Sequence, residues 1–242
     1  MKKAVLFDMD NTLIDREKAM RIAYRDQVKL FYPDDEAKQE EMYGYLLEID
    51  DHGQMPPLRR YQYARDRMGF SQELVYEGAD WWNANQPYYT IVYPQAKKTL
   101  RALQKKYRLG MVTDGQIWTQ RKKLETAGLE EFFEAVLVSS EVGKDKPHPR
   151  IFEVILEKMN LRPEECYYVG DISWKDIAGA YRAGITPVHI TAHGEIPCPG
   201  FLHIQAIEEL PEALQKYETS LENPETFGEE KWNAGGNLRF YL

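Results

Sequence analysis

Residues 4–12 read Ala4-Val5-Leu6-Phe7-Asp8-Met9-Asp10-Asn11-Thr12, and this stretch decides the fold class. Four consecutive apolar residues are typical of a buried strand in a parallel sheet. Two acidic residues and a threonine follow at once. Ligands of open α/β sheets bind beyond the carboxyl ends of the strands. The sequence therefore predicts a polar site at the end of this strand.

Beyond about residue 90 the chain alternates between strand and helix patterns. Apolar runs predict strands at 109–112, 135–138, 167–169 and 186–190, and helical spacing predicts helices at 119–127, 149–159 and, as a closing element, 207–217. This alternation predicts an α/β fold with a Rossmann-like parallel sheet covered by helices.

Residues 16–89 interrupt that alternation. Met20, Tyr24 and Val28 share one helical face, and similar spacing recurs around Leu58 and Leu74. No convincing strand pattern lies among them, so an all-helical insert is expected. The predicted domains are a core of residues 1–15 and 90–217, an insert of 16–89, and a tail of unknown order at 218–242.

Composition limits the class of partner. Lysine and arginine number 31 against 39 acidic residues, a net charge of −8 that disfavours nucleic-acid polymers and anionic membranes. It leaves room for a small anion in a local positive pocket. Only two cysteines occur, with no paired spacing, and no apolar run has membrane or signal-peptide character. A reducing cytoplasm is the default expectation, and the oligomeric state is not indicated.

The first candidate cluster contains Asp8 and Asp10. A carboxylate can attack phosphorus to form an acyl phosphate, and a second carboxylate can protonate a leaving oxygen and then activate water. Aspartate is also common in turns. On its own, the cluster fits both interpretations equally well.

Two further clusters follow later strands. Thr113 and Asp114 precede a predicted helix, whose free N–H groups would bind phosphate. Thr113 with Gln116 also resembles a capping box. Lys146 precedes a proline and could neutralise phosphate charge, although a lysine in such a loop is usually solvated. Lys144 is the alternative to Lys146.

The fourth cluster is Gly170-Asp171, with Asp176 five residues beyond Asp171. Carboxylates without nearby nitrogen or sulfur ligands suit Mg²⁺, a hard cation that keeps several waters. Ser173 with Asp176 also resembles a capping box, so structural and catalytic roles for Asp176 can coexist.

Together and in this order, the four clusters resemble the four motifs of the haloacid dehalogenase (HAD) superfamily, and the insert resembles its helical C1 cap. The resemblance spans residues 3–190. It implies a Mg²⁺-dependent phosphatase with Asp8 as nucleophile and Asp10 as general acid and base. Thr113 and the Asp114 backbone N–H would hold the phosphoryl oxygens, and Lys146 would neutralise charge.

By the same resemblance, Mg²⁺ would be held by Asp8, the Asp10 backbone carbonyl and Asp171. Asp176 would support the metal or the lysine, and Thr12 and Gly170 complete their motifs. Asn11 stands where glycine is common in the family, and Asp114 where many members have asparagine. Neither departure removes a catalytic atom.

Other activities stay open at this point. A phosphomutase would share the whole site, whereas a dehalogenase needs neither Asp10 nor Asp171. A receiver-type signalling domain lacks such an insert, and a non-catalytic binding module would not need the full set. The expected substrate is a small phosphorylated metabolite such as phosphoglycolate, a sugar phosphate or a nucleoside monophosphate. Aromatic residues and arginines of the insert, among them Arg59, Arg60 and Arg65, could contact it, but aromatic residues at helical spacing are usually core and arginines are usually solvated, which is the favoured interpretation.

Overall fold

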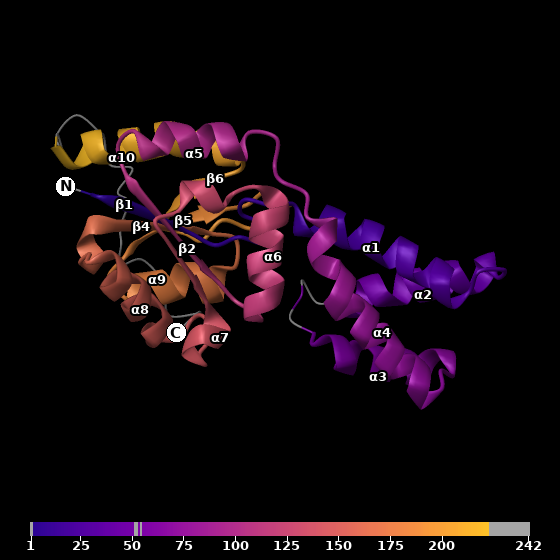
Figure 1. The fold of residues 1–242 in the computed structure, drawn as a ribbon. Helices are drawn as coiled ribbons and strands as arrows, with labels where there is room; N and C mark the ends of the chain where they lie inside the picture. Colours follow the sequence, from indigo (N-terminus) through magenta and orange to yellow (C-terminus); the bar gives the residue numbers. More distant parts are fainter. Residues whose placement is uncertain (1, 51–52, 54, 223–242) are drawn as a thin grey trace. The chain divides into compact units, whose positions relative to one another are not determined.

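The computed structural model describes residues 2–50, 53 and 55–222, which form two compact units (Figure 1). The first unit, called the core here, contains the described residues of Met1–Ile14 and Val92–Leu242. The second, called the helical unit, contains those of Asp15–Ile91. The chain passes between the units twice, and an antiparallel bridge joins Ile14 to Val92 at these passages.

The core is built on a parallel sheet. Its strands are β1 (Ala4–Phe7), β2 (Arg108–Thr113), β3 (Ala135–Val138), β4 (Cys166–Gly170), β5 (Thr186–Ile190) and β6 (Leu202–Ile204). They lie in the order β3-β2-β1-β4-β5-β6, and every neighbouring pair is parallel. The predicted fold class is confirmed. The order places β1 between β2 and β4, so three strands that end in candidate residues are neighbours.

Helices cover both faces of this sheet (Figure 1). They are α5 (Ala96–Gln104), α6 (Ile117–Ala127), α7 (Ser139–Val142), α8 (Pro149–Met159), α9 (Ala178–Arg182) and α10 (Leu210–Glu222). Shorter turns are η3 (Glu130–Phe132), η4 (Pro163–Glu165), η6 (Ile207–Glu209) and the π-helical η5 (Ser173–Ile177). Alternate residues of β1 point to opposite faces: Val5 and Phe7 join the apolar cluster of α5, α6 and α10, whereas Ala4 and Leu6 join that of α8.

The helical unit consists of α1 (Arg16–Phe31), α2 (Glu36–Ile49), α3 (Pro57–Met68), α4 (Gln72–Asn85) and the turn η2 (Gln86–Tyr89). The side chains of Asp15, Asp35 and Ser71 cap α1, α2 and α4 by accepting backbone N–H bonds. Its apolar centre includes stacked rings of Tyr24 and Trp82, 4.5 Å apart.

A buried ion cluster lies within the helical unit. The Asp50 carboxylate accepts from Arg16 at 2.7 Å and from the Tyr24 hydroxyl at 2.6 Å, and it forms an ion pair with Arg60 Nη2 at 3.0 Å. The Arg60 guanidinium is 4.7 Å from the Trp82 ring centroid and only 2% of the residue is exposed. Burial opposes charge on Asp50, but the two arginines outweigh it and lower the pKa of Asp50 to about 2. Arg60 is therefore a core residue of this unit.

The sequence pattern missed some elements. Helices α2 and α5 and strand β6 were not anticipated, and α10 continues past the predicted end at 217. Glu218 lies in α10, and its carboxylate accepts from the Tyr107 hydroxyl at 2.8 Å and pairs with Lys106. These contacts hold this part of α10 to the rest of the core. The remainder of the predicted tail, 223–242, lies outside the described residues. The capping-box interpretation of Thr113 is wrong: Thr113 ends β2, and the N-cap residue of α6 is Gln116.

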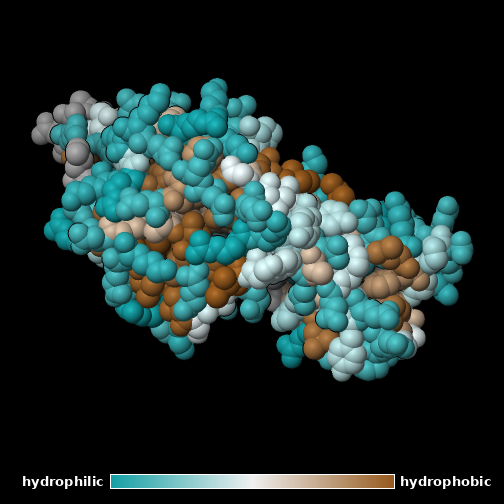
Figure 2. Space-filling view, in the orientation of Figure 1, coloured by the Kyte–Doolittle hydropathy of each residue, from teal (hydrophilic) through white to brown (hydrophobic). Residues whose placement is uncertain are grey.

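The face of the molecule drawn in Figure 2 is mostly hydrophilic, with hydrophobic side chains in scattered groups. Among the described residues, every helix falls short of the length and apolar character that crossing a bilayer requires.

Candidate active site

Asp8 lies directly after β1. Its backbone N–H donates to the Val169 carbonyl at 2.9 Å, which continues the ladder between β1 and β4 by one residue. Asn11 then has φ of +54°, a left-handed conformation that asparagine adopts more readily than most residues. The strand therefore ends in a sharp turn that carries Asp8 and Asp10. At position 11, where glycine is common in the family, asparagine is suited to the left-handed conformation of this turn.

Lys146 forms hydrogen bonds with one aspartate at the end of β1 and with another in η5. Its ammonium group donates to Asp8 Oδ1 and to Asp176 Oδ1, both at 2.7 Å, and the residue is buried. Burial alone lowers the pKa of Lys146, but Asp176 and Asp8 outweigh it and raise that pKa well above its usual range. Lys146 is therefore a fixed positive charge beside Asp8. Lys144, the alternative considered above, is exposed.

Three carboxylates gather at this point. Asp8, Asp171 and Asp176 each place an oxygen within 4.8 Å of the others. Burial raises the pKa of Asp8 to about 7, against the opposing effect of Lys146, and burial also raises the pKa of Asp171 well above its usual range. Asp171 Oδ1 is buried and has no hydrogen-bond partner among the described residues. Three acids beside one ammonium group, with one oxygen unsatisfied, fit a divalent cation.

Asp10 is held away from this group by α6. Its carboxylate lies 2.9 Å and 2.8 Å from Lys123 Nζ through Oδ1 and Oδ2. Gln120 Nε2 donates to Asp10 Oδ2 at 3.2 Å. The Asp10 side chain is thus outside the three-carboxylate group, whereas Asp176 is inside it. Any contribution of Asp10 to a metal would come from its backbone carbonyl.

Thr113 and Asp114 follow β2. The buried Thr113 hydroxyl accepts from Gln120 Nε2 at 2.6 Å. The Asp114 carboxylate accepts from the Lys146 backbone N–H at 3.0 Å and pairs with Lys175 Nζ at 3.2 Å. The negative charge that aspartate adds at this position is therefore offset by Lys175.

Gly170 and Asp176 depend on each other. A Cβ atom at Gly170 would lie 2.4 Å from Asp176 Cγ. Asp176 Oδ2 accepts from the Ile172 backbone N–H at 3.0 Å, so it does support the turn, as the capping interpretation required. The N-cap residue is Ile172, and Ser173 lies inside η5. Asp176 thus has both a structural contact and a contact with Lys146.

Thr12 and His189 are two further buried polar residues near the candidate site. Thr12 follows Asp8 and Asp10 in the chain, and His189 contacts Asp171. Thr12 Oγ1 has no hydrogen-bond partner. His189 Nδ1 accepts from the Cys198 backbone N–H at 3.1 Å, so Nε2 carries the proton and donates to the Asp171 carbonyl at 2.8 Å. Burial lowers the pKa of His189, which favours this neutral form. His189 therefore fixes the backbone of Asp171.

Sequence reasoning missed Gln120, Lys123, Lys175 and His189. A signal existed for two of them. Gln120 and Lys123 lie three residues apart, beside Leu124 and Ala127, so the spacing places two polar residues on the inward face of α6. A lysine on the buried face of a helix needs a partner, which marks it as a candidate site residue.

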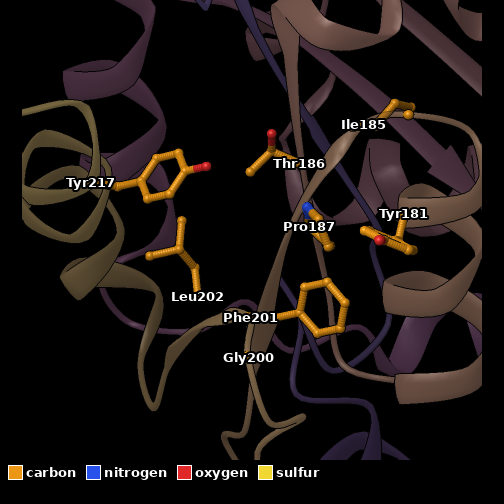
Figure 3. Close-up of a pocket in the computed structure, with 9 residues that line it drawn as sticks. Tyr181, Ile185, Thr186, Pro187, Gly200, Phe201, Leu202 and Tyr217 are labelled. Atoms are coloured by element: carbon orange, nitrogen blue, oxygen red, sulfur yellow. The ribbon is translucent and has the colours of Figure 1, made fainter. Parts of the chain in front are cut away.

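A separate cavity of the core lies at the other ends of the strands. It has a volume of about 180 Å³ and is lined by residues that begin β5 and β6, with the rings of Tyr181, Phe201 and Tyr217 around it (Figure 3). The candidate active site follows the carboxyl ends of β1, β2 and β4. The cavity in Figure 3 therefore belongs to a different part of the core.

Comparison with known proteins agrees with this geometry. A family model described as haloacid dehalogenase-like hydrolase matches residues 2–184. The chain belongs to this family, and the predicted family membership is confirmed.

Individual relatives are phosphatases. A glyceraldehyde 3-phosphate phosphatase of Methanopyrus kandleri is 35% identical over 78% of this chain and 84% of its own. The human N-acylneuraminate-9-phosphatase is 29% identical over 88% of this chain and 94% of its own. The crystal structure of a HAD phosphatase from Thermococcus onnurineus matches 88% of this chain and 97% of its own at 27% identity, with a TM-score of 0.62. The predicted phosphatase activity on a HAD core is confirmed.

Proposed function

We propose that this chain hydrolyses a small phosphate monoester with Mg²⁺ and an aspartyl-phosphate intermediate on Asp8. One observation carries the proposal. The Asp8 carboxylate lies 2.7 Å from the buried Lys146 ammonium and belongs to the same cluster of three carboxylates as Asp171, whose Oδ1 lacks a hydrogen-bond partner among the described residues. A nucleophile, a fixed positive charge and a cation site are what phosphoryl transfer requires.

The metal site would use the Asp8 and Asp171 side chains, with Asp176 adjacent and the Asp10 backbone carbonyl as the further ligand that the family resemblance implies. A bound Mg²⁺ supplies positive charge that stabilises the phosphoryl oxygens and the nucleophile. The donor set is entirely oxygen, as Mg²⁺ prefers.

The chain's own residues then divide the reaction between them. An Asp8 oxygen attacks phosphorus while the bond to the leaving oxygen breaks, and Asp10 gives that oxygen a proton. Water next attacks the acyl phosphate, Asp10 takes its proton, and Asp8 and inorganic phosphate are released. Lys146 offsets the negative charge of Asp8 throughout, and Thr113 and the Asp114 backbone N–H bind phosphoryl oxygens.

The helical unit, from about residue 16 to 89, is proposed to act as a cap that limits substrates to small esters. Both passages between the units are adjacent, since Ile14 pairs with Val92 and the Asp15 N–H donates to the Ile91 carbonyl at 2.7 Å. The relatives' names specify small phosphorylated metabolites, which supports the same substrate class. Two free, buried cysteines suit a reducing compartment such as the cytoplasm.

Phosphate release from a panel of small esters tests the proposal. Triose phosphates, sugar phosphates and sugar-acid phosphates should include at least one substrate, and a folded phosphoprotein should not be dephosphorylated. EDTA should abolish the activity and Mg²⁺ should restore it. Full turnover in metal-free buffer would refute the metal role, and a strong preference for the phosphoprotein would refute the cap role.

A further inference from the structure

Lys123 is a buried lysine whose charge has a single described acidic partner. Only 6% of its side chain is exposed, and Nζ contacts both carboxylate oxygens of Asp10, at 2.9 Å and 2.8 Å. Burying an ammonium group costs several kcal/mol unless it is paired. The two-oxygen contact supplies that pairing and fixes the plane of the Asp10 carboxylate.

Gln120 extends this arrangement along α6. Its side-chain amide donates to Thr113 Oγ1 at 2.6 Å and to Asp10 Oδ2 at 3.2 Å. Gly115 leaves room for it, because a Cβ atom there would lie 3.1 Å from Gln120 Cγ. One helix face therefore connects Asp10, in the turn after β1, to Thr113, which ends β2.

The acidic residues of the site therefore pair with two different lysines. Asp8 and Asp176 contact Lys146 and belong to the group that suits a cation, whereas the Asp10 side chain contacts Lys123 and does not belong to it. A cation bound by that group would attract the negatively charged Asp10 carboxylate, and the contact with Lys123 opposes this attraction. A carboxylate that bound the metal could no longer meet the leaving oxygen or the attacking water.

We propose that Lys123, assisted by Gln120, is the positioning residue for Asp10: it keeps the Asp10 side chain off the metal and aimed at the proton-transfer position. This inference rests on the proposed function for the role of Asp10. Lys123 acts only through its contact with the Asp10 carboxylate. Its effect should therefore depend on how much each step needs Asp10.

The test compares Lys123→Met with wild type on two substrates. An aryl ester such as p-nitrophenyl phosphate has a leaving group that needs no proton, whereas an alkyl ester such as glycerol phosphate does need one. For Lys123→Met, kcat/KM should fall roughly 10- to 100-fold on the alkyl ester and less than about threefold on the aryl ester. Hydrolysis of the acyl phosphate should slow, so nitrophenolate should appear in a burst of about one equivalent.

Three variants provide controls. Lys122→Met removes the neighbouring lysine of α6, which pairs with the exposed Glu125, and should keep both rates within about twofold. Lys123→Arg keeps the charge and should recover part of the alkyl-ester rate. Asp10→Asn should reproduce the burst, and adding Lys123→Met to it should cost little more, because both changes act through Asp10.

The outcomes separate this inference from the proposed function. Equal losses on both esters, or full additivity with Asp10→Asn, would mean that Lys123 is only structural and would overturn the inference. If wild type released no phosphate from any ester, the proposed function would fail first. A crystal structure of Lys123→Met then decides the positioning role alone: an Asp10 side chain that stays in place overturns it, and one that moves toward Asp171 supports it.

Discussion

The two units of the chain each bury a cluster of charges, and the clusters have opposite compositions. In the core, Lys146 contacts the carboxylates of Asp8 and Asp176, and the Asp171 carboxylate lies in the same acidic group. In the helical unit, the carboxylate of Asp50 stands between two guanidinium groups, Arg16 and Arg60. Each cluster also contains unsatisfied atoms: Asp171 Oδ1 in the first, and Arg60 Nε and Nη1 in the second.

The difference lies in how the excess charge is stabilised. The guanidinium of Arg60 faces the rings of Trp82 and Tyr24, which attract a cation through their π faces. No comparable partner exists among the described residues for the excess negative charge of the core, and burial raises the pKa of Asp8 and Asp171 instead. We infer that the cluster of the helical unit stabilises the fold, whereas that of the core is arranged for a ligand.

The largest expected effect is on catalysis, from Asp8→Asn. Turnover should fall by about 10⁴-fold or more because the nucleophile is gone. Thermal stability should be kept or increased, because Lys146 retains Asp176 and the change removes a carboxylate whose charge burial disfavours. Phosphate release and a thermal melt measure the two effects. A large loss of stability in Asp8→Asn would mean that the charge cluster of the core also stabilises the fold, as that of the helical unit is inferred to do.

The converse effect is expected from Asp50→Asn. Asp50 pairs with both Arg16 and Arg60, and removing its charge takes this ion pair from the buried Arg60 guanidinium, which should cost about 3–5 kcal/mol of unfolding free energy. Urea unfolding measures it. Asp66→Asn, which breaks an exposed pair with Arg65, is the matched control and should cost less than about 1 kcal/mol. Equal costs for the two variants would contradict a stabilising role.

Mg²⁺ should stabilise one unit through its acidic cluster. With Mg²⁺ about 100-fold above its dissociation constant, the core should gain about 3 kcal/mol. Asp171→Asn should abolish most of that gain, since Asp171 carries the unsatisfied oxygen. Melting curves with and without Mg²⁺ check this without any substrate. A gain that survives in the variant would place the cation elsewhere.

Acid should act on the helical unit within a defined range. The pKa of Asp50 falls from 3.8 to about 2 in the folded state, so its contribution is complete above about pH 4 and is lost as pH falls toward 2. That contribution is about 2 kcal/mol. The difference in unfolding free energy between wild type and Asp50→Asn, followed from pH 5 to 2, isolates it from the other carboxylates. A difference that does not change with pH would refute the assignment.

The smallest effect is expected at the border of the core cluster. Lys175→Met leaves the Asp114 charge without its lysine and should raise KM about fivefold, corresponding to about 1 kcal/mol. The double variant with Asp114→Asn should recover most of this loss, because both charges are then absent. Steady-state kinetics of the three variants measures the coupling. No recovery would mean that Lys175 acts on something other than Asp114.

Local pattern predicted five of the six described strands, including the edge strand β3, and missed the edge strand β6. The strand β1, the strand β5 and the helix α8 appear at the predicted residues because each is a continuous or regularly spaced apolar segment. The strand β6 has only three residues and forms because β5 offers it an edge. Helix α5 was missed because two lysines and an arginine interrupt the series of its inward apolar residues Ala96, Leu100 and Leu103.

The same limit applies to the site. Asp8, Asp10, Thr113 and Asp171 follow strands, so topology predicts that they lie at one edge of the sheet. Lys123 lies in mid-helix, and its partner Asp10 is more than a hundred residues earlier. Nothing local links the two residues. Arg60 was a candidate for substrate contact by type alone, and its burial beside Asp50 could only be learned from the fold.

Gly170 has a consequence for how this protein can vary. Any side chain at this position would push Asp176 aside, and Asp176 in turn orients Lys146. In a saturation-mutagenesis library, position 170 should therefore be as intolerant as the nucleophile itself, although a glycine has no functional group to offer. Alanine, the smallest available change, already adds the offending atom. Evolution toward new substrates in this scaffold must therefore proceed through other positions.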